Sequence, residues 1–158
     1  MSKKQSFYEE LSKSLASLLA DSPTKVACLA NASALIFETV EDLNWVGFYE
    51  LNEAKDALYL GPFQGKVACQ ILRLGKGVCG TAIAERKAIR VDDVHAFPGH
   101  IACDAASASE LVIPLSAKDE LYGVLDIDSP RLSRFDEEDV AGFRLLSKVI
   151  ERKLNELN

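Results

Sequence analysis

The stretch ELVIPLSAKDELYGVLDID, residues 110–128, decides the fold class of this chain. Its two halves, residues 110–116 and 121–128, are rich in aliphatic and β-branched residues, which favour strands. The polar residues 117–120 between them predict a short turn, so the two halves are expected to form a β-hairpin. Strands joined in this way run antiparallel.

The segments outside this hairpin predict further strands and a helix at each end of the chain. The other predicted strands are residues 43–51, 57–61, 65–72 and 89–91, the first two forming a second hairpin. The predicted helices are residues 4–20, 23–40, 81–86 and a long one that follows a cap at 135–138 and continues to 154. We therefore expect an α+β fold: a mainly antiparallel central β-sheet with the N- and C-terminal helices on one face. The long irregular segment 92–109 would cover a pocket on the other face.

Composition narrows the classes of function. The chain has 158 residues, 48% of them hydrophobic and 27% charged, which suits a single domain over residues 1–158. Its net charge of −6 argues against nucleic acid or an anionic membrane as a partner, because both require a basic surface. No segment approaches the ~18 apolar residues of a membrane span, and the N-terminus lacks an apolar signal core. We expect a cytoplasmic protein.

The four cysteines are Cys28, Cys69, Cys79 and Cys103. Cytoplasmic thiols are normally kept reduced, so each is core filler, a metal ligand or a reactive thiol. Cys28 has the spacing of a core residue in its predicted helix. Cys103 lies in the long loop and is the natural nucleophile, because loops carry function more often than strands do. The loop could bring it to Cys69, on a predicted strand, or to Cys79, where a helix N-terminus would lower the thiol pKa.

A zinc site is the competing interpretation of these thiols. His95, His100 and Cys103 lie close in the sequence, but no pair of cysteines has the tight C-x₂₋₄-C spacing of structural zinc sites. The glycine-rich turn at residues 75–80 lacks the spacing of a phosphate-binding loop. The sequence therefore predicts neither a metal nor a bound cofactor.

Three carboxylates are expected to meet on one face of the sheet. Asp126 and Asp128 point to the same side of their strand, because side chains alternate along a strand. If the hairpin pairs symmetrically about Asp119, Glu110 lies opposite Asp128. No Lys or Arg lies beside them in that pattern, so each charge would raise the pKa of the others. One group would stay protonated as a general acid, and the cluster could hold an ammonium group; ordinary solvated acids at a strand end are the alternative.

An aromatic cluster occupies the segment NWVGFY, residues 44–49. Alternation puts Trp45, Gly47 and Tyr49 on one face of the strand and Val46 and Phe48 on the other. Such a wall could hold a thioether or a methyl group. We take Tyr49 to be a core residue.

Six segments together carry a resemblance to a known family: NWVGFY (44–49), GPFQG (61–65), GVCG (77–80), VDDVH (91–95), FPGHIACD (97–104) and GVLDIDS (123–129). In them the chain closely resembles the free methionine-(R)-sulfoxide reductases, and the order of its elements resembles a GAF domain. The match runs from about residue 44 to residue 135, with no departure at the motif positions. Cys28 lies outside the pattern.

The resemblance implies a thiol-dependent reductase that converts free L-methionine-(R)-sulfoxide to L-methionine. It implies that Cys103 is the catalytic nucleophile, which becomes a sulfenic acid. It favours Cys69 as the main resolving thiol, with Cys79 as an alternative or relay. Thioredoxin would regenerate the thiols, no cofactor would be needed, and the protein would be a homodimer.

The resemblance also assigns roles to the acids and the tryptophan. Glu110, Asp126 and Asp128 would bind the substrate and supply the proton, and Trp45 would contact the substrate methyl. Two alternatives remain at this point: a non-catalytic GAF-type sensor of a small ligand, for which we would expect an attached output domain, and a thiol redox sensor without a substrate.

Overall fold

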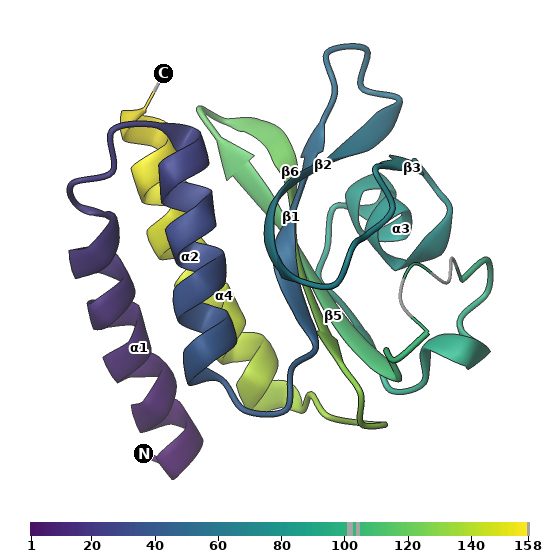
Figure 1. Cartoon of the computed structure of the whole chain (residues 1–158), viewed down its shortest axis with the longest axis horizontal. Helices are drawn as coiled ribbons and strands as arrows, with labels where there is room; N and C mark the ends of the chain where they lie inside the picture. The colour runs from purple at the N-terminus through teal and green to yellow at the C-terminus, as the bar shows by residue number, and fades with distance from the viewer. Residues whose placement is uncertain (101–102, 104, 158) are drawn as a thin grey trace.

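The computed structural model, which describes residues 1–100, 103 and 105–157, has three layers. Helices α1 (Lys3–Leu19), α2 (Lys25–Thr39) and α4 (Glu137–Glu156) lie on one face of a six-stranded sheet. The short helix α3 (Gly77–Glu85) and several connections lie on the other face, on the right in Figure 1. This arrangement confirms the predicted α+β class, with a mainly antiparallel sheet and the terminal helices on one of its faces.

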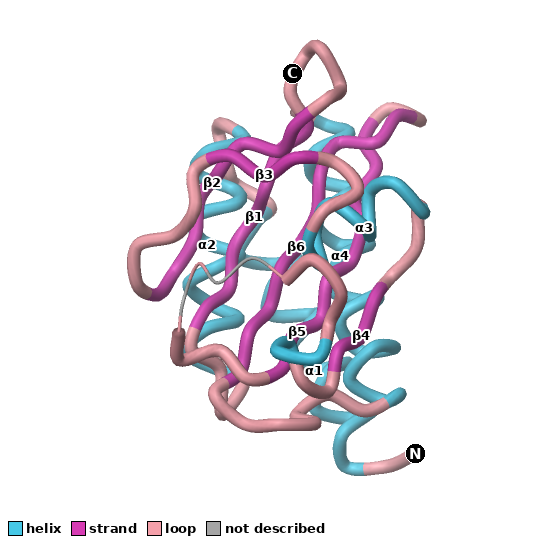
Figure 2. Tube along the Cα trace, turned by 90° about the vertical axis from the view of Figure 1, so that its right-hand side faces the viewer, coloured by secondary structure: helices cyan, strands magenta, loops and turns pink. Residues whose placement is uncertain are grey.

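Every strand pair in the sheet is antiparallel, and the order is β3-β2-β1-β6-β5-β4. The strands are β1 (Trp45–Leu51), β2 (Ala57–Gly65), β3 (Ile71–Arg73), β4 (Ile89–Val91), β5 (Ser109–Ala117) and β6 (Glu120–Ser129). Figure 2 views them from the side of α3, with the long helices behind. The central strands β1 and β6 are each paired on both edges, which makes them a rigid platform for side chains that point away from the helices.

The alternation of side chains divides the interior into two cores. Val46 and Phe48 of β1 pack with the long helices, whereas Trp45 and Tyr49 pack on the side of α3. The helix side is held together by residues at a helical spacing of three and four, which in α1 are Tyr8, Leu11, Leu15 and Leu19. Helices α1 and α4 each begin with a capping box, at Ser2 and at Asp136.

Three predicted boundaries were wrong in ways that matter for the site. The predicted strand 65–72 is mostly irregular: β2 continues to Gly65, and β3 begins only at Ile71. Gly65 has φ +129°, and a Cβ there would meet the Trp45 ring at 2.6 Å, so the chain bends away from β1 at this residue. Helix α3 begins at Gly77, four residues before the predicted start, and therefore contains Cys79. Helix α2 begins at Lys25, after a Thr24 cap, rather than at Pro23.

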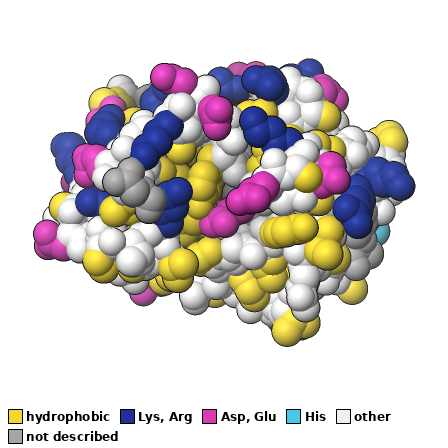
Figure 3. Space-filling model, turned by 90° about the horizontal axis from the view of Figure 1, so that it is seen from above, with side chains coloured by type: hydrophobic (Ala, Val, Ile, Leu, Met, Phe, Trp, Pro, Cys, Tyr) yellow, Lys and Arg dark blue, Asp and Glu magenta, His cyan; other side chains and the backbone are white. Residues whose placement is uncertain are grey.

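The predicted long loop contains a 3₁₀ turn, Val94–Ala96, and leads into β5 at Ser109. Ile101, Ala102 and Asp104 of the FPGHIACD segment lie outside the described residues. Within the described part of the chain, no helix has the length and apolar character needed to cross a bilayer. On the face shown in Figure 3, the described Lys and Arg side chains are interspersed with Asp and Glu.

Candidate active site

A cavity opens on the face of the sheet opposite the long helices. Its walls come from β1, β3, β5, β6, the N-terminal half of α3 and the connections that carry Val67, Ala68, His100, Cys103 and Ser107. The seven residues that the sequence singled out lie around it: Trp45, Cys79, Cys103, Glu110, Asp126 and Asp128 line its wall, and Cys69 is bonded to Cys103. These residues come from segments that are far apart in the sequence.

The hairpin β5–β6 brings the three carboxylates together as its symmetric pairing predicts. Glu110 lies opposite Asp128, and Val112 lies opposite Asp126. Glu110 is 9% exposed and Asp126 is 5% exposed. Among the described residues, no Lys or Arg forms an ion pair with Glu110 or Asp126. Glu110 and Asp126 are therefore buried without an ion pair to any described Lys or Arg.

Burial controls the protonation of this cluster. It raises the pKa of Glu110 well above its ordinary value, and the charges of Asp126 and Asp128 raise it further. Burial also raises the pKa of Asp126, but hydrogen bonds from Glu110 and from the Cys79 thiol act in the opposite direction. Of these two carboxyl groups, Glu110 is therefore the one whose surroundings more strongly favour the protonated form. One oxygen of Asp126, Oδ1, accepts no hydrogen bond from the described residues.

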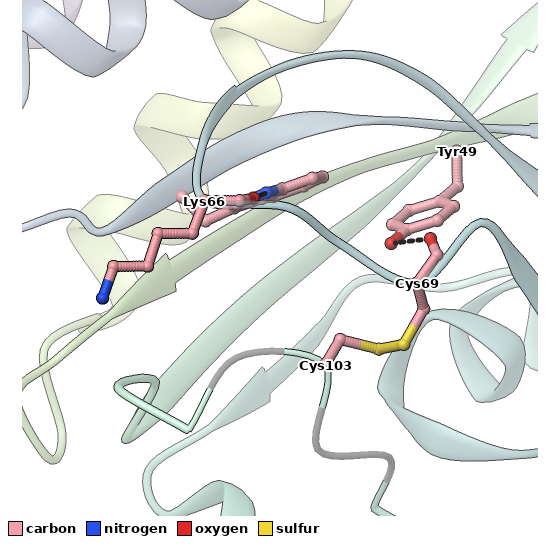
Figure 4. Close-up of a disulfide and its surroundings, with 5 residues drawn as sticks. Tyr49, Lys66, Cys69 and Cys103 are labelled. Carbon is pink, nitrogen blue, oxygen red and sulfur yellow. Dashed lines mark hydrogen bonds between the residues drawn. A yellow bond between two sulfur atoms is a disulfide. The ribbon is translucent and has the colours of Figure 1, made fainter.

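The thiols fall into two groups. Cys69 and Cys103 form a disulfide with their Cα atoms 5.4 Å apart, although 34 residues separate them in the sequence (Figure 4). Cys28 and Cys79 are free and buried. Cys28 is 0% exposed in the core under the long helices, as its spacing predicted.

The predicted lowering of the Cys79 pKa is wrong. Cys79 does lie in the first turn of α3, but its side chain is buried against the acids. Burial raises its pKa well above the ordinary value, and the charges of Asp126 and Glu110 raise it further. These effects outweigh the helix N-terminus, so Cys79 is held as a neutral thiol.

Among the described residues, one group has the side chains and spacing that could hold a metal ion. It consists of Cys79, Glu110 and Asp126, with one ligand atom of each within 4.8 Å of the others. The histidines weighed for zinc lie differently. The exposed His95 contacts Asp93, and its ring lies 6.0 Å from that of His100. Burial, together with His95, lowers the pKa of His100, which lines the cavity.

Aromatic side chains form the remaining wall. The Trp45 ring stacks on Phe63 at 5.2 Å and on Tyr49 at 5.8 Å between centroids. The Trp45 Nε1–H donates to the carbonyl of Lys66 at 3.2 Å, and the Tyr49 hydroxyl donates to the carbonyl of Cys69 at 2.8 Å (Figure 4). Trp45 thus presents a flat apolar surface that is held at its edge.

Comparisons with known proteins agree with this geometry. A family model described as "GAF domain" matches residues 29–154. The free methionine-R-sulfoxide reductase of Escherichia coli K12 is 50% identical over 151 residues, which cover 96% of this chain and 90% of that protein. The protein of that name from Saccharomyces cerevisiae is 43% identical, covering 85% of this chain and 78% of its own.

The chain belongs to the free methionine-R-sulfoxide reductases, a GAF-domain family of oxidoreductases.

A solved structure of another member extends the match to three dimensions. The free methionine-R-sulfoxide reductase of Neisseria meningitidis, solved in complex with its substrate, superposes with a TM-score of 0.91 at 42% identity, covering 98% of this chain and 92% of that one. The resemblance drawn from the sequence motifs is confirmed.

The contacts of two aromatic side chains in the site were not predicted from the sequence. Phe63 was not singled out, and its stacking on Trp45 depends on the pairing of Gly47 with Phe63 across β1 and β2. Tyr49 was taken as core; it is 2% exposed, but its hydroxyl reaches Cys69. A signal was available for Tyr49, because alternation had already placed it on the same face as Trp45.

Proposed function

We propose that this protein reduces free L-methionine-R-sulfoxide to L-methionine by way of a Cys103 sulfenic acid and a Cys69–Cys103 disulfide. One observation carries the proposal: a disulfide between two cysteines distant in sequence borders a cavity lined by Glu110 and Asp126, two buried acids that form no ion pair with a described Lys or Arg. The names of the E. coli and N. meningitidis relatives support the substrate.

The cavity offers complementary groups for each part of a free amino acid sulfoxide. The Asp126 oxygen that lacks a partner among the described residues can accept a hydrogen bond from the substrate ammonium. The stacked Trp45 ring offers an apolar surface for the methyl group. Neutral Glu110 offers a proton for the sulfoxide oxygen. Asp128, opposite Glu110, completes the acidic wall that favours a cationic ligand over a neutral one.

The chemistry proceeds in two balanced steps. The Cys103 thiolate attacks the sulfoxide sulfur while Glu110 gives its proton to the sulfoxide oxygen and becomes a carboxylate. The bond between this oxygen and the substrate sulfur then breaks, the oxygen passes to Cys103 as a sulfenic acid, and methionine leaves. The Cys69 sulfur then attacks the Cys103 sulfur, the S–O bond breaks, and the hydroxyl leaves as water with the thiol proton. The Cys69–Cys103 disulfide would be the product of this second step, and the presence of that bond in the structure supports the proposal.

The proposed role of Cys79 is smaller than that of Cys69. Cys79 is held neutral by burial beside the acids, where its thiol donates a hydrogen bond to Asp126. A neutral thiol is a poor nucleophile. Cys79 as an alternative or relay thiol therefore stays a prediction, which the Cys79→Ser variant tests.

An external dithiol protein of the thioredoxin type would reduce the disulfide by exchange. Because this cycle requires reducing surroundings, we propose that the protein works in the cytoplasm. The homodimer implied by the resemblance stays a prediction, which light scattering on the purified protein checks.

The deciding experiment is turnover of free methionine-R-sulfoxide, with the S epimer and a peptide-bound sulfoxide as matched substrates. Without reductant, the reduced protein should release one equivalent of methionine and gain the Cys69–Cys103 disulfide, found by mass spectrometry of its peptides. With thioredoxin and its reductase, turnover should become continuous. If peroxide forms the disulfide but no methionine appears, the protein is a thiol redox sensor; binding of a ligand without either change would indicate a non-catalytic GAF-type sensor.

A further inference from the structure

The segment that carries Cys69 is a short irregular connection between β2 and β3. This segment, residues 66–70, is here called the strap. Its outer side faces solvent, since Val67 is 87% exposed, and its Val67 and Ala68 also line the cavity. The strap pairs with no strand, so hydrogen bonds to its carbonyl groups fix the position of the Cys69 backbone.

The strap is attached to the sheet at three carbonyls. Trp45 Nε1–H donates to Lys66 at its beginning, and the backbone N–H of Leu60 donates to Gln70 at its end, at 3.0 Å. Between them, the Tyr49 hydroxyl donates to Cys69 itself at 2.8 Å (Figure 4). Of these three hydrogen bonds, only the one from Tyr49 is made to Cys69, the residue that carries the resolving sulfur.

We propose that Tyr49 is a positioning residue for the resolving step: its hydroxyl holds the backbone of Cys69 so that the Cys69 sulfur stays within reach of Cys103. The proposal rests on the function proposed above. An intramolecular step gains its rate from the effective concentration of the two groups, which falls when one of them is free to wander. The hydroxyl bond maintains that concentration while the two sulfurs are not yet joined.

The ring of Tyr49 and its hydroxyl have separable roles. Stacking on Trp45 at 5.8 Å and filling of the core require only the ring, which phenylalanine also provides. The hydroxyl is buried, and burial together with the charge of Asp126 raises the pKa of Tyr49, so the hydroxyl keeps its proton and donates it to the carbonyl. A Tyr49→Phe variant therefore removes the attachment of the strap and leaves the wall of the cavity in place.

The first experiment separates the two chemical steps in Tyr49→Phe. Reduced protein is mixed with free methionine-R-sulfoxide, and methionine, sulfenic acid (trapped with a 1,3-dione) and disulfide are followed in time. We expect the burst of methionine to be unchanged within about twofold and disulfide formation to slow by about tenfold, with sulfenic acid accumulating; tenfold is about the value of one well-made hydrogen bond.

The matched control is Tyr122→Phe. The Tyr122 hydroxyl is also partly buried and donates to Glu50 at 2.8 Å, away from the strap, so both steps should keep their wild-type rates. Circular dichroism and thermal melting of both variants establish that they are folded. If Tyr49→Phe slows methionine release as much as disulfide formation, Tyr49 supports the substrate pocket and the proposal is overturned; unchanged disulfide formation also overturns it.

The second experiment uses no sulfoxide and so does not depend on the proposed function. Wild type, Tyr49→Phe and Tyr122→Phe are equilibrated in glutathione buffers, and the Cys69–Cys103 disulfide is quantified. Loss of positioning should make the disulfide of Tyr49→Phe about tenfold easier to reduce, a shift of about 30 mV. An equal equilibrium constant in all three proteins contradicts the proposal. A wild type that forms the disulfide but never releases methionine sinks the proposed function instead.

Discussion

The protein buries acidic side chains in two places, and it treats them in opposite ways. Among the long helices, Asp139 is 1% exposed and is surrounded by donors. Lys4 lies 2.9 Å and Arg134 3.3 Å from its Oδ2, and the Tyr8 hydroxyl donates to its Oδ1 at 2.7 Å. Every charge there has an opposite charge beside it, so this carboxylate ties α1, α4 and the segment before α4 together.

On the other face of the sheet, Glu110 and Asp126 are similarly buried, but no described Lys or Arg pairs with them. An unpaired buried charge costs several kcal/mol, of the order of 3–5 when a partner is missing. Burial and the nearby charges of Asp126 and Asp128 raise the pKa of Glu110, and protonation of this group would reduce the cost. The difference teaches that the charge of Asp139 is paired within the chain, whereas Glu110 and Asp126 form no ion pair with a described Lys or Arg. This is the basis of our proposal that the second cluster binds a cationic group and donates a proton.

The cysteines give the largest test of this comparison. We expect Cys103→Ser to abolish methionine formation even in a single turnover, because a hydroxyl cannot accept the oxygen as a sulfenic acid. Cys28→Ser, which alters the buried sulfur on the helix side, should leave the specific activity of the folded protein unchanged. Release of methionine is measured by chromatography with excess enzyme. Wild-type activity in Cys103→Ser would refute the nucleophile assignment.

The acids give the next largest effect. Glu110→Gln keeps the shape of the side chain but removes its transferable proton, so kcat for sulfoxide reduction should fall by about 10²-fold or more. At about pH 4, where the carboxyl group is protonated in both the folded and the unfolded state, the free energy of unfolding should change little, because the glutamine then replaces a neutral group. Asp128→Asn should also slow the chemical step. Both are measured by steady-state kinetics beside urea denaturation, and an unaltered kcat in Glu110→Gln removes it as the proton donor.

Asp139→Asn should show the reverse pattern. It leaves Lys4 and Arg134 without their shared charge, and because both cations are partly exposed we expect a loss of about 2 kcal/mol in stability. The kcat per folded molecule should not change. Urea denaturation and activity below the transition measure the two quantities. A drop in kcat with unaltered stability would contradict the division into a structural cluster around Asp139 and a functional cluster around Glu110.

The contrast between the two faces could be predicted from the sequence only in part. Alternation and a symmetric turn are local properties, so they correctly gave the pairing of Glu110 with Asp128 and the separation of Trp45 from Phe48. The position of Cys103 in the long loop made it the expected nucleophile, and the motif segments favoured Cys69 as its resolving partner. The helices at the two ends followed from spacing of apolar residues alone.

The strap and the protonation of Cys79 could not be predicted in this way. GKVACQIL has the composition of a strand, but the bend at Gly65 and the bonds from Trp45 and Tyr49 arise only when β1 and β2 are paired. The helix N-terminus near Cys79 is visible in the sequence, whereas the two acids that reverse its effect come from a hairpin more than thirty residues later. Burial and charge at a distance decide these features.

The pH dependence of stability gives the smallest and most specific test, because the two faces should respond with opposite sign. The folded state raises the pKa of Glu110, so its contribution to stability is complete below the unfolded value of about 4.3 and is lost as the pH rises through the folded pKa. Near α4, burial acts to raise the pKa of Asp136, but the hydrogen bonds from Lys4 and from the Asp139 N–H bring it to about 2. Its contribution is present above the unfolded value of about 3.9 and is lost as the pH falls toward 2.

The free energy of unfolding should therefore be measured by urea denaturation from pH 2 to pH 9. Each variant should lose the pH dependence in a different part of this range. Glu110→Gln should flatten the decline that begins above about pH 4.3, by no more than about 1.4 kcal/mol per pH unit for one proton, and Asp136→Asn should flatten the loss of stability below about pH 3.9. Because Asp126 titrates together with Glu110, the decline above about pH 4.3 belongs to the cluster, and Asp126→Asn should change it as well. A profile of Glu110→Gln that parallels the wild type up to pH 9 would mean that the carboxyl is ionised in the folded protein. The proton for the sulfoxide oxygen would then have to come from another group.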